Sequence, residues 1–293
     1  MESYGWRTVI INSRARLSLC NGNLKVEKED AAETVSLSQI RSLMINTSDV
    51  SITGYLINAL NENNIKLIFC DEKRQPSCEL VGYHNNTSTA GRHLDQISWS
   101  ESIKSEVWSE IVHDKIMSQY KVLKNNGIPE CELLLDIAEC VYPENATVQE
   151  ALAAKLYFAK LFGKNFNRRT ISVINDALNY GYSIIMSSVS RAIVLHGYLT
   201  SIGVNHCSQR NPFNFSCDIM EPFRAYVDNY VYRNPPEELN WRYKRSLIDL
   251  SVSTVIYSEK KMELQTALDM YVNDVLTELS EKSKRKGVLD FYE

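Results

Sequence analysis

Residues 206–224 read HCSQRNPFNFSCDIMEPFR and bring a histidine, two carboxylates and two arginines close together in the chain. Asp218 and Glu221 are three residues apart, so on a helix they share one face. Ile219, Phe223 and the tyrosines that follow them have the spacing of a separate apolar stripe. This pattern predicts a helix from Asp218 to Tyr232, capped by Ser216, with both acids pointing away from the buried face. Acids in a first helical turn also complement the helix dipole, which is an alternative, purely structural explanation.

After about residue 95, nearly all of the chain has helical period. Predicted helices cover residues 98–124, 129–140, 148–162 and 175–202, and two more follow at 237–251 and 261–284. We therefore expect the C-terminal part of the chain to be an all-α domain.

The first eighty or so residues have a different character. Short β-rich runs separated by turn residues predict antiparallel strands at 8–11, 16–19, 24–26, 34–37, 42–45, 65–70 and 78–81. Ser48 looks like the cap of one helix that runs to about Glu62. The polar segment from His84 to Asp95 predicts a loop. The fold class is thus α+β with two domains: a small N-terminal sheet or sandwich with one helix (1–90) and a larger all-α domain (91–293).

Composition places the chain among ordinary globular proteins. It has 293 residues, 44% of them apolar, and seven cysteines without the paired spacing of a zinc site. The amino terminus lacks the pattern of a secretory signal, and the most apolar run, Tyr182 to Tyr198, is too polar to span a bilayer. We expect a cytoplasmic protein with reduced thiols and no membrane partner.

Charge is distributed unevenly along the sequence. The net charge of −4 argues against nucleic-acid binding by the whole surface. Residues 151–169, however, contain five cations and no acid: Lys155, Lys160, Lys164, Arg168 and Arg169. Such a stretch is suited to binding phosphates.

Glu150 lies directly before this basic stretch. Thr147 and Glu150 have the spacing of a capping box, in which the glutamate would bond to the Thr147 N–H. A carboxylate beside a phosphate-binding surface would instead require a cation between the two. With His206, Asp218 and Glu221, it makes a possible ligand set for Mg²⁺ or Mn²⁺, although such sets also arise by chance.

Several motifs together resemble one protein family over nearly the whole chain. They are NDALNYGY (175–182), His206 and DIMEPFR (218–224), supplemented by GWRTVIIN (5–12), IFCDEKRQP (68–76), SWSESIKSEVW (98–108), YFAKLFG (157–163) and the tail KGVLDFYE. This combination resembles the CRISPR-associated spacer-acquisition integrase, in the version found beside type II-A effector nucleases. Ala225 departs from the pattern, since many relatives have proline after Phe-Arg.

The resemblance implies a site and a reaction. It implies that Glu150, His206 and Glu221 are catalytic metal ligands for Mg²⁺ or Mn²⁺, with Asp218 as an auxiliary acid. The 3′-hydroxyl of a captured DNA fragment would attack a phosphodiester at the leader end of the CRISPR array, a transesterification. We expect DNA-backbone contacts from Lys155, Lys160, Lys164, Arg168, Arg169, Arg210 and Arg224.

The resemblance also implies partners. These are double-stranded DNA (the prespacer and the leader-repeat), a second copy bound through the N-terminal domain, and a small ferredoxin-fold partner that completes a heterohexamer. The type II-A ring-forming accessory protein and the RNA-guided effector nuclease would contribute as well. Two other functions stay open: a metal-dependent DNA nuclease that acts in repair without integration, and a non-catalytic DNA-binding scaffold.

Overall fold

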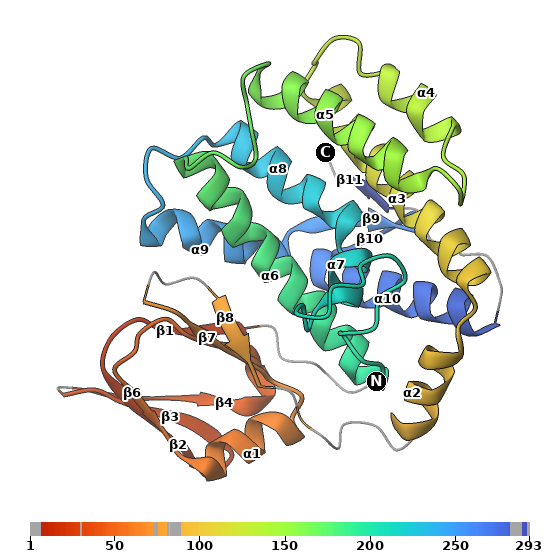
Figure 1. The fold of residues 1–293 in the computed structure, drawn as a ribbon. Coiled ribbons are helices and arrows are strands. Elements are labelled where there is room, and N and C mark those ends of the chain that lie inside the picture. Colours follow the sequence, from red (N-terminus) through yellow and green to blue (C-terminus); the bar gives the residue numbers. More distant parts are fainter. Residues whose placement is uncertain are drawn as a thin grey trace. The chain divides into compact units, whose positions relative to one another are not determined.

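The computed structural model describes residues 7–29, 31–72, 76–80, 82, 89–281 and 289–291. The chain divides into two compact units, Met1–Thr87 and Ser88–Glu293. The first is built from strands and the second mostly from helices (Figure 1). The α+β class predicted from the sequence is therefore confirmed at this level, while the roles predicted for the two parts, dimerisation and catalysis, stay predictions.

Two four-stranded sheets form the N-terminal unit. The first has the order β1-β5-β7-β8, with β1 at Arg7–Ile11, β5 at Ile40–Ile45, β7 at Lys66–Cys70 and β8 at Pro76–Glu79. The second has the order β4-β3-β2-β6, with β2 at Ala15–Cys20, β3 at Asn23–Glu27, β4 at Ala32–Ser36 and β6 at Val50–Ile52. Leu17 and Leu24 from one sheet and Leu43 and Leu67 from the other are buried in a common core.

The predicted antiparallel pairing is only partly right. β2, β3 and β4 are antiparallel, but β1 pairs with β5, β5 with β7 and β2 with β6 in parallel. Helix α1 (Gly54–Glu62) lies between β6 and β7 in the chain. Long connections of this kind allow neighbouring strands to run in the same direction, and the strand pattern alone does not report them.

Helix α1 also begins later than predicted. Val50–Ile52 is a strand, and Thr53 caps the helix by accepting a hydrogen bond from the Leu56 N–H at 3.3 Å. Ser48 is therefore not the cap. The β-branched residues Val50 and Ile52 pair with β2 instead of entering the helix.

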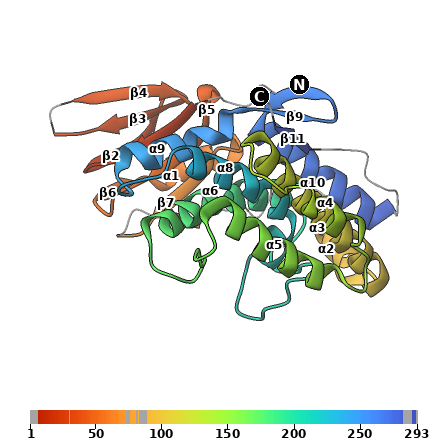
Figure 2. The ribbon, with the colours of Figure 1, turned by 90° about the horizontal axis from the view of Figure 1, so that it is seen from above.

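Helices α3 and α6 organise the C-terminal unit (Figures 1 and 2). Helix α3 (Glu101–Asn125) packs against α4 (Leu133–Glu139) and α5 (Ala146–Phe162). Helix α6 (Val173–Leu195) packs against α7 (Asn214–Ile219) and α9 (Trp241–Asp249). Two further helices, α8 (Arg224–Arg233) and α10 (Leu264–Glu281), contact both α3 and α6. These contacts join the two groups of helices.

Away from Glu150 and the 206–224 stretch, three predictions for this unit need correction. Helix α2 (Thr89–Ser98) lies partly within the segment predicted as a polar loop, of which residues 84–88 are outside the described residues. Its Gln96 is buried and bonds to the backbone of Leu199 and Ile202, so a polar residue anchors it. Helix α6 ends at Leu195 instead of Ile202, because Gly197 adopts a positive φ and closes a C-terminal turn.

The third correction is a small sheet in the part predicted to be all α. Strands β9 (Thr254–Tyr257), β10 (Lys260–Glu263) and β11 (Leu289–Phe291) form it in the order β10-β9-β11. Ser258 and Glu259 both have positive φ and connect β9 to β10. The turn lacks the Asn-Gly or Asp-Gly sequence that normally marks such a hairpin, and so the pattern did not indicate it.

Across the described residues, the helices do not include one with the length and apolar character that crossing a membrane requires. All seven cysteines have free thiols.

Candidate active site

The predicted helix from Asp218 to Tyr232 is broken into three pieces. Helix α7 ends at Ile219, a short 3-10 turn (η2) covers Glu221–Phe223, and α8 begins at Arg224. Pro222 lies in this turn and has no N–H for a continuous helical ladder. Ser216 does not cap a helix; its hydroxyl lies within α7 and accepts a hydrogen bond from Ser190 at 2.8 Å.

The break changes where the two acids lie. Asp218 and Glu221 are 0% and 4% exposed, so the prediction that they point away from the buried face is wrong. Because Asp218 lies in the last turn of α7 and Glu221 begins η2, they do not share a helical face but enter separate polar networks.

Asp218 organises the loop that contains His206. Its two carboxylate oxygens accept hydrogen bonds from the backbone N–H groups of Val204, Asn205 and His206, at 2.7, 3.1 and 3.0 Å. The loop depends on Gly203, because a Cβ there would lie 2.5 Å from Asp218 Oδ2 and 2.6 Å from the His206 carbonyl oxygen. The carboxylate thus fixes the loop from inside.

Asp218 also holds the imidazole ring. His206 Nδ1 lies 2.5 Å from Asp218 Oδ1, and this hydrogen bond is the main reason why the pKa of His206 lies above its usual value. The His206 side chain is 41% exposed, and Trp108 contacts it edge-on with ring centroids 6.1 Å apart. With Nδ1 bonded to a carboxylate, Nε2 is the ring nitrogen left to bind a ligand.

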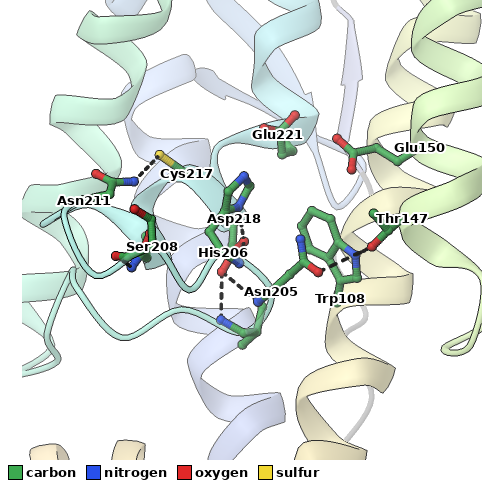
Figure 3. Close-up of polar contacts among 12 residues, drawn as sticks. Trp108, Thr147, Glu150, Asn205, His206, Ser208, Asn211, Cys217, Asp218 and Glu221 are labelled. Atoms are coloured by element: carbon green, nitrogen blue, oxygen red, sulfur yellow. Dashed lines mark hydrogen bonds and ion pairs between the residues drawn. The ribbon is translucent and has the colours of Figure 1, made fainter.

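Glu150 is not part of a capping box. Helix α5 begins at Ala146, so Thr147 lies inside it, where its hydroxyl accepts a hydrogen bond from Trp108 Nε1 at 3.2 Å and donates one to Asn205 Oδ1 at 3.4 Å. In Figure 3, the Glu150 carboxylate points from α5 toward Glu221. The side chain of Glu150 is therefore directed at the site and not at its own backbone.

A buried lysine joins the two glutamates. Lys115 Nζ lies 2.6 Å from Glu150 Oε1 and 2.6 Å from Glu221 Oε2, and Arg224 reaches the other oxygen of Glu221 at 3.0 Å. Burial alone would raise the pKa of Glu221, but the charges of Arg224 and Lys115 outweigh it and hold this pKa below its usual value. The carboxylates of Glu150 and Glu221 thus converge on the Lys115 ammonium group.

The donor set suits a divalent cation, but the described side chains do not form a complete metal site. Within the described ranges, no group of three or more His, Cys, Asp or Glu side chains is arranged so that it could hold one ion. One oxygen of Glu150 and one of Glu221 nevertheless lie close together, because each is 2.6 Å from the Lys115 ammonium nitrogen. Carboxylate oxygens with one imidazole nitrogen are ligands suited to Mn²⁺ or Mg²⁺.

The seven predicted DNA-binding cations fall into two groups. Three make contacts within the protein: Lys160 pairs with Glu130 at 2.8 Å, Arg168 bonds to Asn175 and Asn179, and Arg224 bonds to Glu221 and lies over the Tyr182 ring. The others are exposed at the surface: Lys155, Lys164, Arg169 and Arg210.

Sequence reasoning missed Lys115 and Trp108, which α3 directs at the site. The two residues are seven positions apart, so they lie on one face of the helix together with Ile111 and Val112. A lysine within an apolar stripe is rarely buried unless it is paired. That signal could have identified Lys115.

Comparison with known proteins gives the same family for most of the chain. The sequence profile described as CRISPR associated protein Cas1 matches residues 8–234. A CRISPR-associated endonuclease Cas1 of Neisseria meningitidis is 29% identical over 96% of this chain and 94% of its own length. One from Pyrobaculum aerophilum is 28% identical over 75% of this chain and 79% of its own.

Solved structures share the fold at lower identity. A casposase bound to integration product superposes with a TM-score of 0.78 at 17% identity, covering 98% of this chain and 95% of that one. A Cas1 protein from Thermotoga maritima gives 0.68 at 13%, covering 94% and 97%. A chain from a Cas6-RT-Cas1–Cas2 complex gives 0.73 at 18%, covering 97% of this chain and 36% of that one.

Proposed function

This chain belongs to the CRISPR-associated Cas1 family, and on that premise we propose that it is a metal-dependent DNA endonuclease and integrase that inserts short DNA fragments into a CRISPR array. The observation that carries this proposal is the convergence of Glu150 and Glu221 on one point, bordered by the His206 loop. The reaction is the attack of a DNA 3′-hydroxyl on a phosphodiester, which leaves a new phosphodiester and a free 3′-hydroxyl.

Glu150, Glu221 and Nε2 of His206 would hold the ion, and Asp218 would act through His206. A bound Mg²⁺ or Mn²⁺ supplies Lewis-acid chemistry at the phosphate. Asp218 binds the Nδ1 proton and so presents Nε2 to the ligand side of the ring. Arg224 restrains Glu221 and places a positive charge next to the site. Each side chain thus has a separate task in orienting the reacting groups.

DNA binding is proposed for the exposed cations Lys155, Lys164, Arg169 and Arg210. Contacts with the DNA backbone from Lys160, Arg168 and Arg224 would require these side chains to leave partners within the protein. The exposed four are therefore the stronger candidates.

The partners are proposed from the relatives. Similar chains have been solved in Cas1–Cas2 complexes, which supports a small partner protein for this chain as well. We propose a dimer through the N-terminal unit and a heterohexamer with that partner on DNA. The type II-A accessory proteins would act with this assembly.

The test uses the protein with its small partner, a labelled duplex and a supercoiled array plasmid. With Mn²⁺ or Mg²⁺ present, joined product is expected from the unmodified protein, and Glu221→Gln should reduce it by at least about a hundredfold because one charged oxygen ligand is lost. The matched control is Glu139→Gln, an exposed glutamate at the end of α4, which should leave joining unchanged. Nicking without joining would identify a nuclease instead, and an unaffected Glu221→Gln protein would exclude this site.

A further inference from the structure

The side chain of Lys115 lies in the middle of the candidate site although sequence and family reasoning assign it no role. The residue is 8% exposed, and its ammonium group is 2.6 Å from a carboxylate oxygen on each of two elements, α5 and η2. A buried lysine at such distances is held by both partners at once. Lys115 therefore fixes the separation between Glu150 and Glu221.

The charges of the side chains around Lys115 determine whether a divalent cation can be added to the site. The carboxylates of Glu150 and Glu221 carry two negative charges, and Lys115 and Arg224 carry two positive charges in direct contact with them. These four side chains are thus neutral in sum, and the Asp218 carboxylate bonded to His206 adds at most one negative charge. Adding a divalent cation would leave a surplus of positive charge in a largely buried space, which is unfavourable unless one of the cationic side chains withdraws.

Geometry indicates which cation withdraws. A protonated ammonium group has three donors and no lone pair, so Lys115 cannot itself ligate a metal. Its ammonium group forms ion pairs with Glu150 Oε1 and Glu221 Oε2, the atoms that a shared ion would need. Arg224, in contrast, bonds to the other oxygen of Glu221 and lies over the Tyr182 ring, so it can remain in place.

We infer that Lys115 is a positioning residue that holds Glu150 and Glu221 together and competes with the divalent cation for their oxygens. The inference rests on the proposed metal-dependent function. It predicts that removing the Lys115 charge changes metal affinity in the direction opposite to that expected for a purely structural lysine. Removing a structural clamp would loosen the two glutamates and weaken metal binding, whereas removing a competitor leaves the site one charge more negative and strengthens it.

The test is Lys115→Met, which keeps a side chain of similar length without the charge. Mn²⁺ binding to the metal-stripped protein is measured by titration calorimetry at fixed ionic strength without DNA. The expected dissociation constant is lower than that of the unmodified protein by about tenfold or more. The control is Lys104→Met on the same helix, where Lys104 pairs with Glu101 at 2.9 Å, and its Mn²⁺ affinity should stay unchanged.

Thermal unfolding gives a second measurement on the same proteins. In chelator, Lys115→Met should melt below the unmodified protein because two carboxylates lose their partner, and Mn²⁺ should raise its melting temperature by more than it raises that of the unmodified protein. If Lys115→Met does not fold in chelator, refolding in Mn²⁺ should recover its native circular dichroism. Failure to recover would contradict the inference.

The results separate this inference from the proposed function. Unchanged or weaker Mn²⁺ binding by Lys115→Met, with normal binding by the unmodified protein, would overturn the role of Lys115 alone. If the unmodified protein binds neither Mn²⁺ nor Mg²⁺, the metal-dependent function fails and the competition fails with it.

Discussion

Asp228 is a buried acid next to the candidate site that the proposed reaction does not use. It lies on α8, is 1% exposed and accepts a hydrogen bond from the Tyr182 hydroxyl. Burial raises its pKa from 3.8 to about 6, although the hydrogen bond and the charges of Arg168 and Arg224 act in the opposite direction. The folded protein thus favours the protonated acid, and ionisation of Asp228 costs stability.

The predicted consequence is a specific pH dependence. Between pH 3.8 and about 6 the folded state binds the Asp228 proton more tightly than the unfolded state, so the stability that it contributes falls as the pH rises through this window. Asp228→Asn removes the titration. The free energy of unfolding of the unmodified protein, relative to Asp228→Asn, should therefore fall by roughly 2 kcal/mol between pH 4.5 and pH 7.

Urea denaturation at pH 4.5, 5.5 and 7 checks this prediction. Asp136→Asn on the exposed face of α4 is the control, and its difference from the unmodified protein should be much less dependent on pH. A difference for Asp228→Asn that stays constant over the same range would contradict the assignment.

At the scale of single elements, the hairpin between β9 and β10 carries backbone strain. Its turn residues Ser258 and Glu259 have φ of 50° and 63°, a region that costs most residues about 1 kcal/mol or more. The turn between β2 and β3 also has positive φ at both residues, 50° at Asn21 and 74° at Gly22, and these residue types tolerate it. The molecule thus contains a favourable and an unfavourable sequence for similar two-residue turns.

The prediction is that exchanging these sequences changes stability in opposite directions. Ser258→Asn with Glu259→Gly should raise the free energy of unfolding by about 1 kcal/mol, because both residues then accept positive φ. Asn21→Ser with Gly22→Glu should lower it by a similar amount. Urea denaturation of the three proteins measures both effects, and a loss of stability in the β9–β10 variant would show that strain at this turn is not the controlling factor.

At the scale of the whole molecule, the positions of the exposed cations determine which side chains can bind the DNA backbone. The basic sequence from residue 151 to 169 does not form one uniform surface, because Lys160 and Arg168 bond to Glu130 and to two asparagines. Lys155, Lys164 and Arg169 remain exposed around them, with Arg210 on the His206 loop. Salt-dependent binding should therefore depend mainly on these four.

This leads to a quantitative prediction for binding to duplex DNA. The slope of log affinity against log salt is negative, and each single substitution to alanine among Lys155, Lys164, Arg169 and Arg210 should make it less negative by about one. Lys28→Ala, an exposed cation of the N-terminal unit, is the control and should leave the slope unchanged. Fluorescence anisotropy at four salt concentrations measures the slope, and an equal response of Lys28→Ala would point to non-specific binding.

Much of the architecture follows from local patterns. Short β-rich runs separated by turn residues predicted most N-terminal strands, and helical periodicity predicted α3, α5 and α10 within a few residues. Such patterns report which side of an element is buried, and this is set by the hydrophobic effect on neighbouring residues. The parallel strand pairing and the β9–β10 hairpin were not predicted, because they depend on connections and on backbone angles that the residue types did not reveal.

The sequence by itself determined the class of the fold and a short set of candidate residues, since residue types and their spacing limit both. Only the tertiary structure decided how those residues are arranged. Asp218 and Glu221 are close in the chain, but α7 ends between them, and they enter a His206 network and a Lys115 network respectively. Glu150 and Glu221 are distant in the chain but bind one lysine. Long-range contacts of this kind arise from the packing of α3 against α5 and η2, and no local pattern contains that information.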